Sequence, residues 1–257
     1  KHPILFPSNP NECFHMAVHA FDLAERLQTP VFLLSDLDIG MNDWMVPELE
    51  WDDSYTPDRG KVLGPEELAE MDRFVRYLDV DGDGIPYRTL PGEDPKGAYF
   101  TRGSGHNKYG GYTENSDEYQ EIVDRLLVKW DTAKTMVPDA VLSQSSKKTR
   151  IGVIAYGSSD GAVIEARDRL AEQGVHVNYL RIRAFPFSPE VLEFLHNHDT
   201  IYVVEQNRDA QMKSLLMLEA NHIADRLVSI LHYNGMPIPS ECVATGIMEH
   251  QGTEAAA

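Results

Sequence analysis

The C-terminal half of the chain alternates short apolar runs with segments of helical periodicity. The apolar runs lie at 151–156, 175–182 and 200–204, and the helical patterns at 162–173, 188–196 and 210–218. Strands that alternate with helices are typical of βαβ units, which build a mostly parallel sheet with helices on its faces. We therefore predict an α/β domain over residues 150–242.

The first fifty residues repeat the pattern of a helix followed by a strand. Asn9 stands where a helix cap is expected, Pro10 suits the first helical position, and apolar residues recur at helical spacing as far as Leu27. The apolar run 31–34 then has the length of a strand, and such runs are typical of parallel sheets covered on both faces. Residues 1–50 are thus predicted to be a piece of a second α/β fold.

Three polar residues, Asp36, Asp38 and Asn42, follow the predicted strand at or near its C-terminal end. Ligands of open α/β sheets usually bind at that edge. These side chains could therefore ligate a metal or orient a cofactor. They could equally cap a helix or hold the loop that follows.

Periodicity fades between residues 51 and 137, where Gly, Pro, Asp and aromatic residues become common. A short helix is expected at 66–78 and a clear amphipathic one from Ser116 to about Trp130. A long irregular stretch is often functional or interface-forming. The polar residues 138–149 are predicted to be an interdomain linker, and 243–257 a tail.

The densest polar group of the irregular stretch is predicted to be a candidate site. It consists of Arg102, His106, Asn107 and Glu114. Histidine titrates near neutral pH, arginine pairs with carboxylates, and the glycines between them let backbone approach a ligand closely. A role near an active site and a contact with another subunit are both compatible with this pattern.

Asp79, Asp81 and Asp83 lie at alternate positions of a loop that resembles the front half of a calcium-binding loop. Gly84 occupies the sixth position, but Leu90 stands at the twelfth, where a bidentate Glu is expected. A turn without metal is therefore favoured over a calcium site.

Composition narrows the range of functions. The 257 residues carry a formal net charge of -18, which disfavours nucleic acid and anionic membranes as partners. No apolar run reaches the length of a membrane span. The two cysteines are too few for an iron–sulfur cluster, and they indicate a reducing, cytoplasmic setting. The chain begins with Lys1 rather than Met, so we expect an upstream segment.

Several segments resemble the alpha subunit of 2-oxoacid:ferredoxin oxidoreductases, in the order of that family. They are 24–42, with Ser-Asp-Leu-Asp-Ile-Gly-Met-Asn at its end, Arg88–Gly92, Gly103–His106, Tyr112–Glu114, 203–211, with Val-Glu-Gln-Asn-Arg-Asp, and Leu231–Gly235. The chain departs from the family where an acid before His106 is replaced by Gly105 and an Asp after it by Asn107. The Tyr-Pro-Ile-Thr-Pro substrate motif is absent from the sequence.

The resemblance implies oxidative decarboxylation of a 2-oxoacid on thiamine diphosphate, transfer of the acyl group to coenzyme A and passage of electrons to ferredoxin. It implies that residues 1–50 end a thiamine-pyrimidine-binding domain and that 150–242 form a transketolase C-terminal-like domain. A partner beta subunit would hold the diphosphate, magnesium and a 4Fe-4S cluster, and a second alpha chain would complete the complex. Ferredoxin would dock elsewhere, because this chain is strongly acidic.

The resemblance assigns no catalytic residue, thiamine ligand or metal ligand to this chain, which is expected to support the site and the assembly of subunits rather than to act alone. The form of the Asp36–Asn42 segment resembles chains that act on 2-oxoglutarate. Two alternatives remain: a subunit of another thiamine enzyme, such as the beta part of an oxoacid dehydrogenase, and a non-catalytic α/β interaction module.

Overall fold

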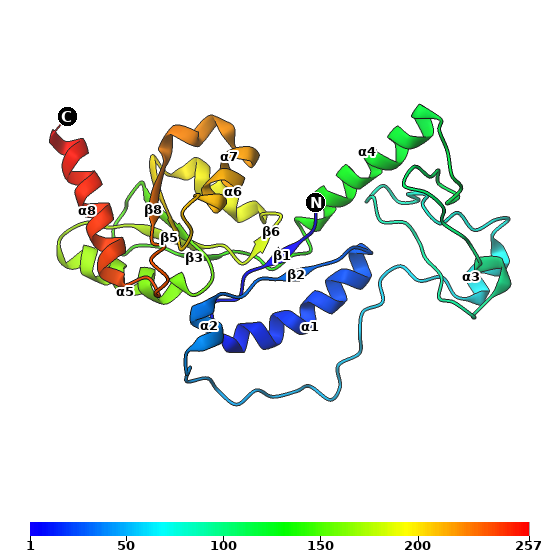
Figure 1. Cartoon of the computed structure of the whole chain (residues 1–257), viewed down its shortest axis with the longest axis horizontal. Coiled ribbons are helices and arrows are strands. Elements are labelled where there is room, and N and C mark those ends of the chain that lie inside the picture. Colours follow the sequence, from blue (N-terminus) through cyan, green and yellow to red (C-terminus); the bar gives the residue numbers. More distant parts are fainter. Residues whose placement is uncertain (257) are drawn as a thin grey trace. The chain divides into compact units, whose positions relative to one another are not determined.

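The computed structural model describes residues 1–256 of the backbone and the side chains of residues 1–252 (Figure 1). The chain forms two compact units, each described here by itself. Unit 1 comprises Lys1–Pro3, Val18–Val31 and Asp52–Met136, and unit 2 comprises Ile4–Ala17, Phe32–Trp51 and Val137–Ala257. No helix in the described part is long and apolar enough to cross a bilayer.

Unit 2 is built on a five-stranded sheet with the order β3-β5-β4-β7-β8. The strands are β3 (Val141–Ser143), β4 (Ile151–Ala155), β5 (Asn178–Arg181), β7 (Thr200–Glu205) and β8 (Leu227–Leu231). All neighbouring pairs are parallel except β3 with β5. The predicted α/β class with a mostly parallel sheet is therefore confirmed.

Helices cover both faces of this sheet, as Figure 1 shows. They are α5 (Ser159–Glu172) and α8 (Ser240–Ala256) on one face, and α6 (Pro189–Asn197), α7 (Gln211–Glu219) and the 3-10 helix η2 (Asn221–Arg226) on the other. Side chains of a strand point alternately to opposite faces. In β7, Ile201 and Val203 accordingly join one core cluster, while Tyr202 and Val204 join the other. Because both faces are buried, residues 201–204 of β7 do not alternate between apolar and polar side chains.

Two segments of unit 2 correct the predicted boundaries. Residues 138–149, expected to be a linker, contain β3, an edge strand whose Val141 and Leu142 are exposed. An edge strand buries little, so its apolar signal is weak. Residues 243–257, expected to be a tail, belong to α8 as far as 256, and Val243 and Ile247 are fully buried beside α5.

A second, three-stranded sheet in unit 2 has the order β2-β1-β6. It joins β1 (Ile4–Leu5), β2 (Phe32–Leu33) and β6 (Ala184–Phe185). The run 31–34 was expected in a sheet covered on both faces. This expectation is wrong for the three-stranded sheet of unit 2. As an edge strand of two residues, β2 leaves Phe32 54% and Leu34 51% exposed.

The predicted first helix is confirmed as α1 (Pro10–Leu27), whose residues up to Ala17 belong to unit 2. The Asn9 side chain accepts the Glu12 backbone N–H at 2.9 Å. The Glu12 carboxylate does not return to Asn9 but accepts both terminal nitrogens of Arg181 in β5, at 2.7 and 2.9 Å. This ion pair is largely buried and fastens the helix start to the large sheet.

Unit 1 contains α3 (Pro65–Glu70), the 3-10 helix η1 (Pro95–Gly97), α4 (Ser116–Ala133) and long irregular segments. The helix expected at 66–78 ends at Glu70, because Met71 is extended and Phe74 instead packs with Leu68 in a small core. The cap of α4 is Asn115 rather than Ser116. Short helix α2 (Leu37–Met41) belongs to unit 2.

Candidate functional site

The strand order of unit 2 creates a crevice at one edge of the large sheet. The chain winds from β4 to β5 on one side and then to β7 and β8 on the other, so the direction of winding reverses between β4 and β7. Open α/β sheets bind their ligands outside the carboxyl ends of the strands at such a reversal. Here those ends are followed by the turn at Gly157 and by residues 206–207.

The carboxylate of Asp36, the residue before α2, bonds to the turn that follows β4. Its Oδ2 accepts the Ser158 backbone N–H at 2.9 Å, and its Oδ1 accepts the Ile39 N–H at 3.0 Å as the cap of α2. Gly157 has φ +62°, and a Cβ there would lie 2.8 Å from the same Asp36 oxygen, so glycine is required. A strand–turn–helix start is a common anion site. Asp36 supplies the anion from within the chain.

A second carboxylate, Glu205, fills the neighbouring position at the end of β7. It is fully buried and accepts backbone N–H groups of Met212 at 2.7 Å and Lys213 at 3.1 Å, at the start of α7. Asn207 Nδ2 donates to it at 2.8 Å. Burial, together with the charge of Glu205, raises the pKa of the Tyr156 hydroxyl well above its ordinary value. The tyrosine therefore stays neutral and can donate a proton in a hydrogen bond.

Gln206 ties the two sides of the reversal together. Its Nε2 donates to Ser158 Oγ at 3.0 Å and to Ser159 Oγ at 3.2 Å. The crevice is thus organised by side chains of the chain itself, and both positions suited to a phosphate already hold carboxylates. We conclude that the turn 157–161 has a structural role.

A cavity of about 610 Å³ lies beside this network in unit 2. Its polar lining is Asp36, Asp38, Asn42, Gln206 and His232. The Nε2 atom of His232 is buried and has no hydrogen-bond partner within the described residues. Asp38 bonds to Asn42, and its carbonyl accepts the Trp44 indole N–H at 3.0 Å. The structure therefore brings all three predicted residues of this segment to one cavity wall.

The other predicted group lies in unit 1 and forms a loop that is held mainly by its own contacts. Asn107 Oδ1 accepts N–H groups of Tyr109 and Gly111, which shapes the turn 107–111. The His106 ring stacks on Tyr77 with centroids 4.3 Å apart. Arg102 is exposed, and the exposed Glu114 accepts the Tyr112 hydroxyl at 2.6 Å. Their role near an active site stays a prediction.

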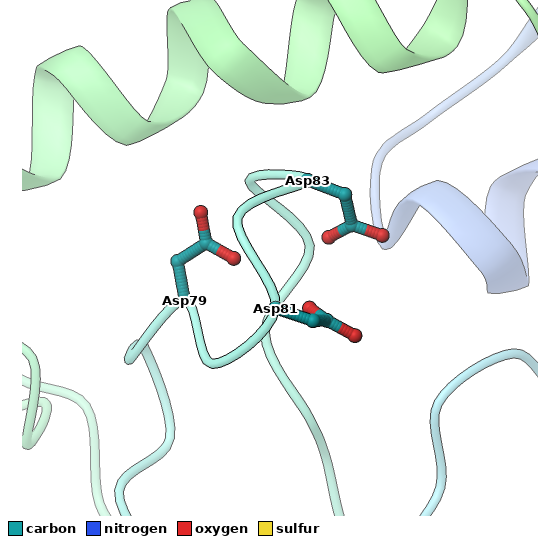
Figure 2. A group of neighbouring side chains, drawn as sticks. All are labelled: Asp79, Asp81 and Asp83. Atoms are coloured by element: carbon teal, nitrogen blue, oxygen red, sulfur yellow. The ribbon is translucent and has the colours of Figure 1, made fainter.

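The aspartates of the calcium-like loop converge in unit 1, as Figure 2 shows. The Lys61 ammonium lies 2.7 Å from Asp81 Oδ1, 2.7 Å from Asp83 Oδ2 and 3.1 Å from the Ile85 carbonyl oxygen. The hydrogen bond from Lys61 holds the pKa of Asp81 below its usual range. An internal cation thus pairs with two of the three aspartates, and the turn without metal stays a prediction.

Replacing Lys61 with methionine should lower the free energy of unfolding by about 1 kcal/mol, because two carboxylates lose their counter-charge. Added calcium should then restore part of that loss, since oxygen ligands at alternate positions suit this ion. Thermal unfolding with and without calcium chloride measures both effects, and Lys147→Met, at an exposed position, is the control. An identical calcium response of Lys61→Met and the unmodified chain would exclude this role of Lys61.

Three residues of the crevice were not predicted from the sequence: Tyr156, Glu205 and His232. Each ends or directly follows a strand of the large sheet. A charged residue directly after the apolar run of β7 was the available signal for Glu205. Nothing local in the sequence indicates that Tyr156 and Glu205, 49 positions apart, share a hydrogen bond.

No family model matches the chain. It is 26% identical to the 2-oxoacid:ferredoxin oxidoreductase subunit alpha of Saccharolobus solfataricus over 242 residues, 92% of this chain and 37% of the relative. It is 29% identical to the 2-oxoglutarate synthase subunit KorA of Methanothermobacter thermautotrophicus over 210 residues, 79% of this chain and 52% of that relative. The chain is a homologue of 2-oxoacid:ferredoxin oxidoreductase alpha subunits. The resemblance drawn from the sequence is thus confirmed.

The fold is similar to that of a solved structure. The 2-oxoglutarate:ferredoxin oxidoreductase of Magnetococcus marinus, solved with 2-oxoglutarate, coenzyme A and succinyl-CoA bound, matches with a TM-score of 0.81 and 20% identity. The match covers 96% of this chain and 42% of that one. This homologue of alpha subunits spans little more than a third of the Saccharolobus relative, 37% of its length.

Proposed function

We propose that the chain is part of the alpha subunit of a thiamine diphosphate-dependent 2-oxoacid:ferredoxin oxidoreductase. The complex would decarboxylate 2-oxoglutarate or a related 2-oxoacid oxidatively, form the acyl-CoA and pass the electrons to ferredoxin. The observation that carries the proposal is similarity to such alpha subunits over 92% of the chain in one alignment. The names of the Methanothermobacter and Magnetococcus relatives support 2-oxoglutarate as the substrate.

The residues of this chain do not fit the cofactors that the reaction requires. An iron–sulfur cluster needs about four thiolates, whereas the sequence has two cysteines, and Cys13 and Cys242 are both free thiols. In the aspartate group that could hold magnesium, two of the three carboxylates already pair with Lys61. We therefore assign thiamine diphosphate, magnesium and the 4Fe-4S cluster to other parts of the complex. The partners of this chain would be a beta subunit and a second alpha chain.

The contribution of this segment is inferred to be support and assembly. The segments that resemble the family, 36–42, 203–211 and 231–235, lie at or next to the crevice of unit 2. Asp36 and Gln206 both bond to Ser158, and the His232 N–H donates to the Glu205 carbonyl, so these segments do not present an open anion site. A cofactor supplies the carbanion chemistry, and the protein supplies position and electrostatics. Residues that hold the crevice in one shape would contribute to position and electrostatics.

The test is an assay of the native complex that contains this chain. Purified complex is supplied with coenzyme A, a viologen as electron acceptor, and 2-oxoglutarate, pyruvate or a branched 2-oxoacid in turn. We expect the fastest viologen reduction with 2-oxoglutarate. Faster turnover of pyruvate would contradict the substrate, and reduction of lipoamide in place of viologen would favour the oxoacid dehydrogenase alternative.

A second measurement addresses the division of labour. The chain purified alone should bind no thiamine diphosphate and should not decarboxylate 2-oxoglutarate, whereas the complex should do both. Decarboxylation by the isolated chain would overturn the supporting role. A complex that lacks both a cluster-bearing subunit and thiamine would instead favour the non-catalytic interaction module.

A further inference from the structure

Three cations gather in unit 1 although the chain as a whole is strongly acidic. They are Arg76, Arg125 and Lys129, and the charge of Arg76 acts on both of the others. Burial, followed by the charge of Arg76, lowers the pKa of Arg125. Burial, followed by the charges of Arg125 and Arg76, lowers the pKa of Lys129 to about 8. The three residues are named here the cationic cluster.

The cationic cluster has no carboxylate bonded to it within the described residues. Arg125 Nη1 donates to the Gly84 carbonyl at 2.7 Å and Lys129 Nζ to the Leu27 carbonyl at 3.1 Å. Asp79, whose charge acts on Arg125, already accepts two backbone N–H groups of its own loop. Carbonyl dipoles satisfy donors but do not cancel three positive charges.

Arg76 is the member with the fewest partners. Its Nε and Nη1 atoms are buried and have no hydrogen-bond partner among the described residues. The guanidinium carbon lies 4.8 Å from the ring centre of Tyr77 and 5.4 Å from that of Tyr99. Aromatic faces attract the cation, but they do not accept the in-plane N–H groups that a carboxylate or phosphate accepts.

Arg76 lines a cavity of about 590 Å³ in unit 1. The loop 88–99 forms the remaining wall, with Thr89, Asp94 and Tyr99 among its residues. The other charged side chains of the wall are engaged: Arg88 pairs with Glu25, and Asp94 accepts the Lys96 N–H as the cap of η1. Arg76 is thus the cationic side chain of this wall to which no carboxylate bonds within the described residues.

We propose that this cavity binds the carboxylate or phosphate group of a small molecule through the Arg76 guanidinium. Burying an uncompensated charge is costly, and an oxyanion would remove that cost by accepting its N–H groups. The charges of Arg125 and Lys129, which interact with that of Arg76, add positive potential, and Tyr99 forms part of the wall. The site is separate from the proposed activity and does not depend on it.

The experiment titrates the full chain with inorganic phosphate and, separately, with succinate, against sodium chloride at matched ionic strength. Isothermal calorimetry measures the affinity. We expect at least one of the two oxyanions to bind more tightly than chloride, and the preferred one assigns the ligand class. Arg76→Gln should weaken that binding about tenfold or more, because a charged hydrogen-bonding partner is lost.

Arg73→Gln is the matched control, because the substitution removes the same charge at an exposed position. Like Arg76, Arg73 lies over an aromatic ring, with its guanidinium carbon 4.2 Å from the centre of the Tyr109 ring. It should retain the affinity of the unmodified chain. Should Arg76→Gln unfold, Arg76→Lys replaces it, and a loss of affinity there supports the site. Binding that equals chloride for both oxyanions, or binding that Arg76→Gln or Arg76→Lys leaves unchanged, overturns the proposal.

Discussion

Replacing Arg181 with methionine should lower the free energy of unfolding by about 3–5 kcal/mol, because the change leaves the Glu12 carboxylate buried without its main counter-charge. Arg181 is 8% exposed and bonds to both oxygens of Glu12. Its Nε also lies 3.4 Å from Asp160 Oδ2. Methionine keeps most of the side-chain volume, so the loss measures the charge interaction rather than a cavity.

The same ion pair should make the free energy of unfolding depend on pH in the acidic range. Burial raises the pKa of Glu12, but hydrogen bonds from Arg181 and Ser8 and the charges of Arg181 and Arg183 outweigh it and lower the pKa from 4.5 to about 2. A depressed carboxyl pKa stabilises the fold above the unfolded value, and this contribution is lost as the pH falls from 4.5 toward 2. It amounts to about 3 kcal/mol.

Urea unfolding of the unmodified chain and of Arg181→Met, at pH values from 7 down to 3, measures both expectations. The variant should be less stable at pH 7, and the difference should shrink as the pH falls. Arg169→Met is the control, because Arg169 forms an exposed pair with Glu165 whose contribution should stay below about 1 kcal/mol. Equal losses for the two variants would contradict the assigned importance of the buried pair.

Replacing Lys129 with methionine should raise the free energy of unfolding by about 1–3 kcal/mol at pH 7, whereas Arg181→Met lowers it. The pKa of Lys129 falls from 10.5 to about 8, so the folded state binds fewer protons than the unfolded state between these values. Stability of the unmodified chain therefore rises with pH through that window. Below pH 8 the lysine is charged in both states, and the folded state bears the full penalty.

Chemical denaturation at pH 7 and pH 10 measures the effect. The advantage of Lys129→Met should be largest at pH 7 and should decrease toward pH 10, because the native lysine loses its charge there. Lys148→Met, at an exposed position, should show neither the gain nor its pH dependence. A destabilised Lys129→Met would indicate that the bond to the Leu27 carbonyl outweighs the charge penalty.

The sequence predicted the parts of the fold whose signals are local. Strand β4 and residues 201–204 of β7 are predominantly apolar because both faces of the sheet are covered. The start of α1 was predicted because Asn9 caps its own helix. β3 was missed because its apolar part is only two residues long, Val141 and Leu142, and a polar stretch follows it. The burial of α8 was missed because Gly and Thr dilute its apolar spacing.

The candidate site was predicted only in part, for a comparable reason. Asp36, Asp38 and Asn42 were expected at a strand end, and they do line one cavity. The hydrogen bond from Ser158 to Asp36 crosses 122 positions, and the pair of Arg181 with Glu12 crosses 169. Contacts of this range follow from tertiary packing, which a single sequence does not reveal.

The carboxylate on the turn after β4 has a consequence for competition. Asp36 belongs to the same chain as that turn and is held against it by the hydrogen bond from Ser158, so it competes with any dissolved anion as an intramolecular ligand whose effective concentration is about millimolar or higher. Free phosphate at lower levels would seldom displace it. The shape of this sheet edge should therefore stay constant while metabolite levels in its surroundings rise and fall.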